Sequence, residues 1–179
     1  MDVHIHTPAS LDYQQPEVTF LDILQRAEKR DLNIIAFTDH NTISGYARLR
    51  NEIEQLELLE KLGRLLPEEN KNLEEYRRLT KKMLLLPGIE FTATFGFHIL
   101  GLFSPQKTVR EIEHVLLDLG ISPGGLDDGN PAIGASVDVI TAYRIINEAG
   151  GIVIAAHANS TNGVAMRGLS FGGQTRIAY

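Results

Sequence analysis

The sequence contains no cysteine among its 179 residues. This absence excludes disulfide bonds, thiolate zinc sites, iron–sulfur clusters and cysteine nucleophiles. No apolar run approaches the length of about 18 residues that a membrane-spanning helix needs. Any metal site in this chain must therefore be built from histidine, aspartate and glutamate.

Positive charge is in the minority. Lys and Arg number 17 against 23 Asp and Glu, which gives a formal net charge of −6 with neutral histidine. An acidic chain disfavours a broad nucleic-acid-binding face, although a local basic patch is compatible with it. The first six residues have neither the basic nor the apolar region of a secretory signal. We therefore expect a cytoplasmic protein without membrane contacts, and the length favours a single domain over 1–179.

Strand-like and helix-like segments alternate along the chain, which predicts an α/β domain. Thr19 with Asp22, and Thr108 with Glu111, have the spacing of capping boxes and mark two helix starts. Strands are predicted over 1–6, 33–38, 84–89, 97–103 and 151–156, and helices over 19–31, 108–119 and 137–149.

The segment 45–83 differs from the rest because it is rich in Leu, Glu, Lys and Arg. Ile53, Leu56 and Leu59 recur at helical spacing. Pro67 interrupts the pattern and suits the first turn of a new helix. We predict two helices, over about 45–63 and 67–82, that form a hairpin. This hairpin is either a solvated insertion or a lid or docking surface.

Ionisable side chains gather where the predicted strands begin or end. In parallel α/β folds the carboxyl ends of the strands meet on one face, where ligands bind. Each residue alone has an ordinary structural explanation, such as a turn, a cap or a half-buried strand position, but all of them together would require a series of coincidences. His114, in contrast, lies within a charged helix and is expected to be ordinary surface. The residues at strand ends are His4, His6, Asp39, His40, Glu90, His98 and His157.

The spacing within this set favours a metal site. His4 and His6 are two positions apart on a strand, so their side chains point to the same side. A carboxylate such as Glu90 can bridge two cations, as two-metal hydrolytic sites require. Imidazole and carboxylate together suit Zn, Mn or Fe, and the residue types alone do not choose between these metals.

Five blocks of sequence, in order, resemble the PHP (polymerase and histidinol phosphatase) domain family of metal-dependent phosphoesterases. The family resemblance implies a distorted seven-stranded (β/α) barrel that carries up to three divalent metal ions at its strand ends. The first block, with the Pro-Ala-Ser that follows it, also resembles PHP domains joined to large ATPase modules. The blocks are DVHIHT at 2–7, FTDHN at 37–41, PGIEF at 87–91, FHILG at 97–101 and IAAHA at 154–158.

The resemblance also implies a role for each candidate ligand. Three metal ions would share seven side chains, with one carboxylate as a bridge between the first two ions. The implied ligands are His4 and His6 for the first metal, Glu90 for the bridge, His98 and His157 for the second metal, and His40 with Asp12 for the third.

Two further residues complete the candidate site. Asp39 joins the catalytic set, either as a ligand or, as we favour, as a group that orients an imidazole. Arg167 follows His157 by ten positions in a predicted loop, and its cation is our candidate for binding a substrate phosphate.

The chain departs from the family pattern in three places. An Asp-x-His block that closes the family's domain is absent after His157. We therefore expect an N-terminal part of the domain, with a barrel incomplete at its C-terminus. The last of the five blocks continues as Ala-His-Ala-Asn rather than Ala-His-Pro, and the 45–83 hairpin is longer than the usual connection.

These features predict hydrolysis of a phosphate ester by a metal-activated water, with a small phosphorylated compound or a nucleotide as substrate. One alternative is a nuclease-type phosphodiesterase acting on nucleic-acid ends, which the net charge does not favour. Another is a non-catalytic metal-binding or docking module of a larger protein, partnered by a downstream domain or by a second copy of the chain. Hydrolysis of C–N bonds, as in amidohydrolases, fits the block pattern less well.

Overall fold

A computed structural model describes residues 1–132, 137–161 and 163. Short 3-10 turns cover Thr94–Gly96 and Pro123–Gly125. Within these described residues, no helix has the length and apolar character needed to cross a membrane. The strands and helices are β1 (Asp2–Ile5), α1 (Phe20–Lys29), β2 (Ile34–His40), α2 (Ser44–Lys61), α3 (Pro67–Lys82), β3 (Leu84–Thr92), β4 (His98–Leu102), α4 (Val109–Asp118), α5 (Val139–Glu148) and β5 (Ile152–Ala155).

The five strands form one mixed sheet in the order β1-β2-β3-β4-β5. β1, β2 and β3 are parallel to one another, whereas β4 runs antiparallel to both β3 and β5. The predicted seven-stranded (β/α) barrel is therefore wrong for the described part of the chain. The physical reason lies in the connection 93–97, which is too short for the crossover of a dozen or more residues that a parallel pair requires.

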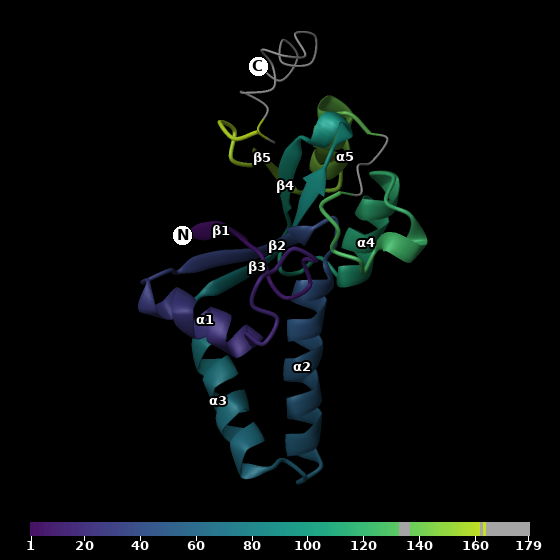
Figure 1. Cartoon of the computed structure of the whole chain (residues 1–179). Helices are drawn as coiled ribbons and strands as arrows, with labels where there is room; N and C mark the ends of the chain where they lie inside the picture. Colours follow the sequence, from purple (N-terminus) through teal and green to yellow (C-terminus); the bar gives the residue numbers. More distant parts are fainter. Residues whose placement is uncertain (133–136, 162, 164–179) are drawn as a thin grey trace.

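Two hydrophobic clusters flank this sheet. One joins β3 and β4 to α4 and α5 through residues such as Phe91, Ile99 and Ile112. The other joins β2 to α1, α2 and α3 through residues such as Phe37 and Leu73. Figure 1 shows the corresponding division, with α1, α2 and α3 grouped together and α4 and α5 beside β4 and β5. The two clusters meet at Leu85 of β3, which packs against both of them.

The predicted hairpin is confirmed as α2 and α3, which project from the sheet (Figure 1). Gly63, with a φ of +64°, turns the chain after α2, and Pro67 occupies the first turn of α3. Leu73 and Tyr76 are buried, and the Tyr76 hydroxyl donates to Glu52 at 2.8 Å. Both predicted capping boxes are also present, at the starts of α1 and α4. Local sequence patterns therefore located these elements to within a few residues.

Candidate metal centre

The predicted convergence of strand ends is present, although the strand directions differ from those expected. β2 ends at His40, which pairs with Glu90 in the register between β2 and β3. His98 opens β4, and because β4 is antiparallel its first residue lies opposite Thr92 near the end of β3. The start of β4 therefore reaches the same edge of the sheet as the ends of its neighbours. Because β4 is antiparallel, its first residue, His98, lies at the site. In a parallel strand the last residue would lie there instead.

Glu90 is the centre of this edge, and only 1% of its side chain is exposed. Three imidazoles surround its Oε2 atom. His6 Nε2 lies 2.8 Å away, His4 Nε2 lies 3.1 Å away and His40 Nδ1 lies 3.2 Å away. These rings come from β1, from the residue that follows it and from β2, and the two strands are adjacent in the sheet.

The second oxygen of Glu90 faces two further imidazoles. His98 Nδ1 and His157 Nε2 each lie 3.0 Å from Glu90 Oε1. The other nitrogen of His157 lies 2.7 Å from the Ser160 hydroxyl, which fixes the orientation of that ring. One buried carboxylate is therefore contacted by imidazoles from β1, β2 and β4 and from the segments that follow β1 and β5.

The five imidazoles also form a closed circle around Glu90. Each imidazole has two neighbouring imidazoles in this circle, and the centroids of neighbours are 4.4 to 5.5 Å apart. The first and last strands of the sheet thereby approach each other at this edge. In order, the members are His4, His6, His40, His98, His157 and then His4 again.

Burial and the contacts around Glu90 shift the pKa values of the side chains in the site. Burial raises the pKa of Glu90, but hydrogen bonds from His4, His6 and His98 outweigh burial and hold the pKa far below its usual range. Burial lowers the pKa of His6, yet the hydrogen bond and charge of Glu90 bring it above its usual value. Burial also dominates at His40, where the pKa falls to about 4. The site at neutral pH thus contains an ionised carboxylate and at least one neutral imidazole, which are the forms that bind metals.

The donor set fits a divalent metal ion. The buried Nδ1 of His40 makes no hydrogen bond within the described structure, although Glu90 Oε2 is 3.2 Å away. Two ligand atoms that are each about 2.1 Å from a shared ion, at right angles, are about 3 Å apart. The nitrogen-to-oxygen distances around Glu90 match this separation. An ion between these atoms would also satisfy His40 Nδ1.

Three groups of side chains could each hold a metal ion, because their ligand atoms all lie within 4.8 Å of one another. Glu90 belongs to two of the groups, which suits a bridging carboxylate. The grouping differs from the one that the family resemblance implies, since His4 is placed with His157 rather than with His6. The groups are His4, Glu90 and His157; His6, Asp12 and His40; and His40, Glu90 and His98.

Asp12 and Asp39 have different contacts in the site. Asp12 is on the loop after β1, with its Oδ2 3.4 Å from His40 Nε2. Asp39 is buried and accepts hydrogen bonds from the Thr7 amide (2.7 Å), the Thr7 hydroxyl (2.9 Å) and the Ser10 hydroxyl (2.8 Å). These bonds hold the loop rather than an imidazole ring. Asp39 therefore positions Asp12 indirectly, by fixing the loop that carries it.

Sequence reasoning missed four residues that support the site: Thr7, Ser10, Gly45 and Ser160. Gly45, in the first turn of α2, lies against the bond between Asp39 and Thr7. A Cβ atom there would be 2.0 Å from Asp39 Oδ2, so only glycine permits the approach. No spacing rule marks such residues, because each acts through a contact formed by the tertiary structure.

Two further predictions, for Arg167 and for His114, concern residues that do not contact Glu90. Arg167 lies outside the described residues, so its assignment to substrate binding stays a prediction. His114 is exposed on α4, as expected for an ordinary surface residue.

Comparison with known proteins adds no family assignment. No protein-family model matches the chain, and no curated protein matches it with significance. The resemblance of the five blocks to the PHP family therefore stays a prediction, and the functional argument depends on the geometry of the site.

Proposed function

We propose that this chain is a metal-dependent hydrolase of phosphate esters that holds two or three divalent ions, Zn, Mn or Fe. The observation that carries the proposal is the convergence of five imidazoles on the buried carboxylate of Glu90. A structural role for so many imidazoles is hard to justify, since one carboxylate cannot balance five of them if they are protonated. Neutral imidazoles and shared cations remove this difficulty.

The chain's residues would prepare the site in distinct ways. Glu90 would hold two ions with its carboxylate, and the neutral His40 would hold one ion, because only one of its ring nitrogens has a free lone pair. Ser160 would keep His157 in its binding orientation. Bound divalent ions would supply Lewis-acid activation of water and neutralise charge on the phosphate oxygens.

The five histidines around Glu90 differ in how much of each side chain is exposed to solvent. His40 and His98 are 5% and 8% exposed, whereas His157 is 35% exposed and Asp12 is 52% exposed. A phosphate group would therefore approach from the side of His157 and Asp12. The buried side would hold the ions rigidly, and the open side would leave room for substrate.

The first experiment is elemental analysis of the purified chain, followed by turnover of p-nitrophenyl phosphate in the presence of Mn²⁺, Zn²⁺ or Fe²⁺. We expect two or three ions per chain and metal-dependent turnover. Single-stranded DNA in a parallel assay separates a phosphomonoesterase from a nuclease. The acidic net charge favours the small substrate.

The matched variants are Glu90→Gln in the site and Glu60→Gln in the hairpin, where Glu60 pairs with Arg77 at the surface. Glu90→Gln should lower the metal content and reduce turnover at least about 100-fold, because loss of a group that merely supports a ligand already costs about 10–100-fold. Glu60→Gln should change neither. If Glu90→Gln keeps its metal and its turnover, the proposed bridge is wrong. If metal binds without turnover of any phosphate ester, the chain is a metal-binding module and not this hydrolase.

A further inference from the structure

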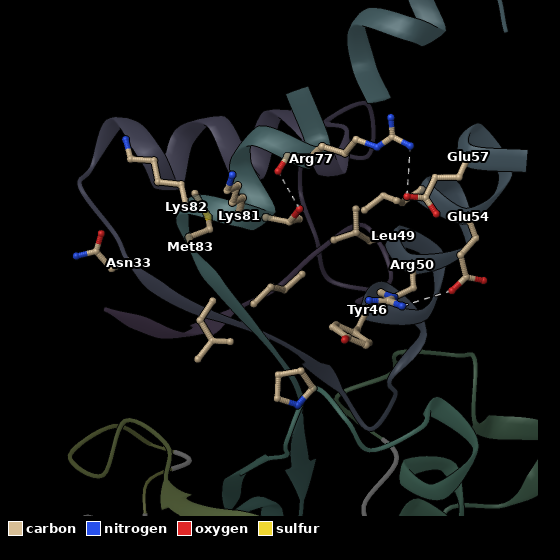
Figure 2. Close-up of a pocket in the computed structure, with 15 residues that line it drawn as sticks. Asn33, Tyr46, Leu49, Arg50, Glu54, Glu57, Arg77, Lys81, Lys82 and Met83 are labelled. Atoms are coloured by element: carbon tan, nitrogen blue, oxygen red, sulfur yellow. Dashed lines mark hydrogen bonds and ion pairs between the residues drawn. The ribbon is translucent and has the colours of Figure 1, made fainter. Parts of the chain in front are cut away.

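A cleft of about 630 Å³ lies at the base of the hairpin, bounded by α2, the end of α3 and the beginning of β3 (Figure 2). It contains none of the five imidazoles that surround Glu90. Its volume is within the range of about 300–1,000 Å³ typical of small-molecule sites. The proposed hydrolase activity does not use this cleft, and the sequence predicts the hairpin beside it either as a solvated insertion or as a lid or docking surface.

Part of the lining of the cleft is apolar. Leu49 and Met83 are buried there, and Ile53 and Leu85 are partly buried. Leu84 also lines the cleft and leaves 47% of its surface exposed. A large, exposed apolar side chain in the lining of a concave surface favours an apolar ligand, because binding would remove that side chain from water.

The walls of the cleft carry more positive than negative charge. Four cations line it, against the two carboxylates of Glu54 and Glu57. Arg50 pairs with Glu54 at 3.5 Å, and Arg77 lies 3.7 Å from Glu57, as the dashed lines in Figure 2 show. Arg77 also pairs at 2.7 Å with Glu60, which lies outside the lining of the cleft.

The two lysines at the end of α3 differ from each other. Lys82 is directed to α1, where its Nζ atom lies 2.7 Å from Glu28. Lys81 lines the cleft, and no carboxylate of the described residues lies within ion-pair distance of it. Asn33, the residue before β2, is exposed and also lines this cleft. Lys81 is thus the cation whose charge the surrounding residues leave unbalanced.

We propose that the cleft binds a small organic anion, with its apolar body against Ile53, Leu84 and Leu85 and its anionic group at Lys81. The charge imbalance selects an anion over a neutral or cationic ligand of the same shape. The apolar part of the lining selects an organic anion over inorganic phosphate. The site is separate from the metal centre, and its occupancy does not depend on whether the chain hydrolyses phosphate esters.

A pair of fluorescent probes tests both parts of the proposal on the full chain. 8-Anilinonaphthalene-1-sulfonate carries an apolar body and a sulfonate, and N-phenyl-1-naphthylamine is the same body without the charge. We expect the sulfonate to bind with one probe per chain and more tightly than the neutral probe. Binding of the neutral probe with equal affinity would overturn the anionic part of the proposal.

Three variants locate the binding. Lys81→Glu should weaken sulfonate binding about fivefold or more, in line with the loss of a hydrogen bond to a charged group, and should change binding of the neutral probe less than about twofold. Leu84→Glu, at an exposed position, should weaken binding of both probes. Lys71→Glu makes the same charge change on α3 outside the cleft and should leave both unchanged.

Circular dichroism and metal content show whether each variant is folded. Equal weakening by Lys81→Glu and Lys71→Glu would show a non-specific charge effect and overturn the site. Unchanged binding in Leu84→Glu would place the probe elsewhere on the chain, with the same consequence. Loss of metal in Glu90→Gln should leave probe binding intact, which separates this proposal from the proposed hydrolase activity.

Discussion

The candidate metal centre and the helical hairpin both contain many ionisable residues, but these residues differ in burial and in sequence separation. Glu90 is buried, and its imidazole partners His6 and His157 lie 84 and 67 residues away in sequence. In the hairpin, Arg77 pairs with Glu60 only 17 residues away, and both side chains are exposed. Exposed pairs contribute about 0–1 kcal/mol each, whereas breaking a buried charged cluster leaves a charge without compensation.

This difference suggests a division of labour within the chain. The hairpin is stabilised by its apolar face against α1 and β2, and its charges mainly keep it solvated. The strand edge is organised around one carboxylate, at the expense of burying charged and polar groups. Substitutions in the two regions should therefore affect different observables, and the following predictions test this expectation from the largest effect to the smallest.

Leu73→Ala should break the hairpin's packing and leave the metal centre intact. Leu73 is fully buried in α3, and truncation of such a leucine lowers the free energy of unfolding by about 2–5 kcal/mol. Denaturant unfolding measures the loss, and elemental analysis of the folded variant should show unchanged metal content. Leu58→Ala, at an exposed position of α2, is the control and should change stability by less than about 0.5 kcal/mol. Loss of metal in Leu73→Ala would show that the two regions are coupled.

Asp39→Ala should have the reverse pattern, with a smaller effect on stability and a clear effect on metal binding. It leaves the Thr7 amide and the Thr7 and Ser10 hydroxyls without their acceptor, which should lower the free energy of unfolding by about 1–3 kcal/mol. The loop that carries Asp12 would lose its anchor. We expect metal affinity to fall by about 10–100-fold, as for other groups that support ligands.

Competition with a chelator measures this affinity. Asp39→Asn is the matched variant, because its amide has the same shape and keeps an acceptor for the loop, and it should retain more metal affinity than Asp39→Ala. If both variants bind metal like the unchanged chain, the loop does not contribute to the site.

The smallest effect should come from the surface pairs of Glu28. Hydrogen bonds from Arg78 and then Lys82 lower the pKa of Glu28 to about 2, from an ordinary value near 4.5. Because the folded-state pKa is depressed, the contribution of these pairs to stability is present above about pH 4.5. It is lost as the pH falls toward 2.

Urea unfolding of the unchanged chain and of Glu28→Gln should therefore give a small difference at pH 7 that shrinks at pH 3. It should also shrink at high salt, which screens exposed charges. A difference that is independent of both pH and salt would mean that Glu28 acts through packing rather than charge.

Sequence patterns predicted the elements of this fold better than their arrangement. The capping boxes at Thr19 and Thr108, and Pro67 at the start of α3, mark helix starts through interactions within one turn, so the sequence alone reveals them. The seven-stranded barrel was wrong because strand number and direction depend on pairing between distant segments. The short connection 93–97, which makes β4 antiparallel, carried the signal that was overlooked.

The candidate site shows the same limit. His4, His6 and Glu90 could be selected because histidine and glutamate at strand ends are unusual, and the structure brings these residues together with the other predicted ligands. Thr7 and Gly45 could not be selected, because threonine and glycine are common and their roles depend on contact with Asp39.

The residue types limit the chemistry of this protein: without cysteine, a metal site can use only imidazoles and carboxylates, and the sequence predicts these residues at strand ends. Helix positions and the hairpin were also determined locally, because helix caps and apolar periodicity act over a few residues. Three features could be seen only in the folded chain: five imidazoles surround Glu90, His4 lies beside His157, and Asp39 holds a loop. These arrangements depend on strand pairing between segments far apart in the chain, and local sequence does not encode the distances that such pairing creates.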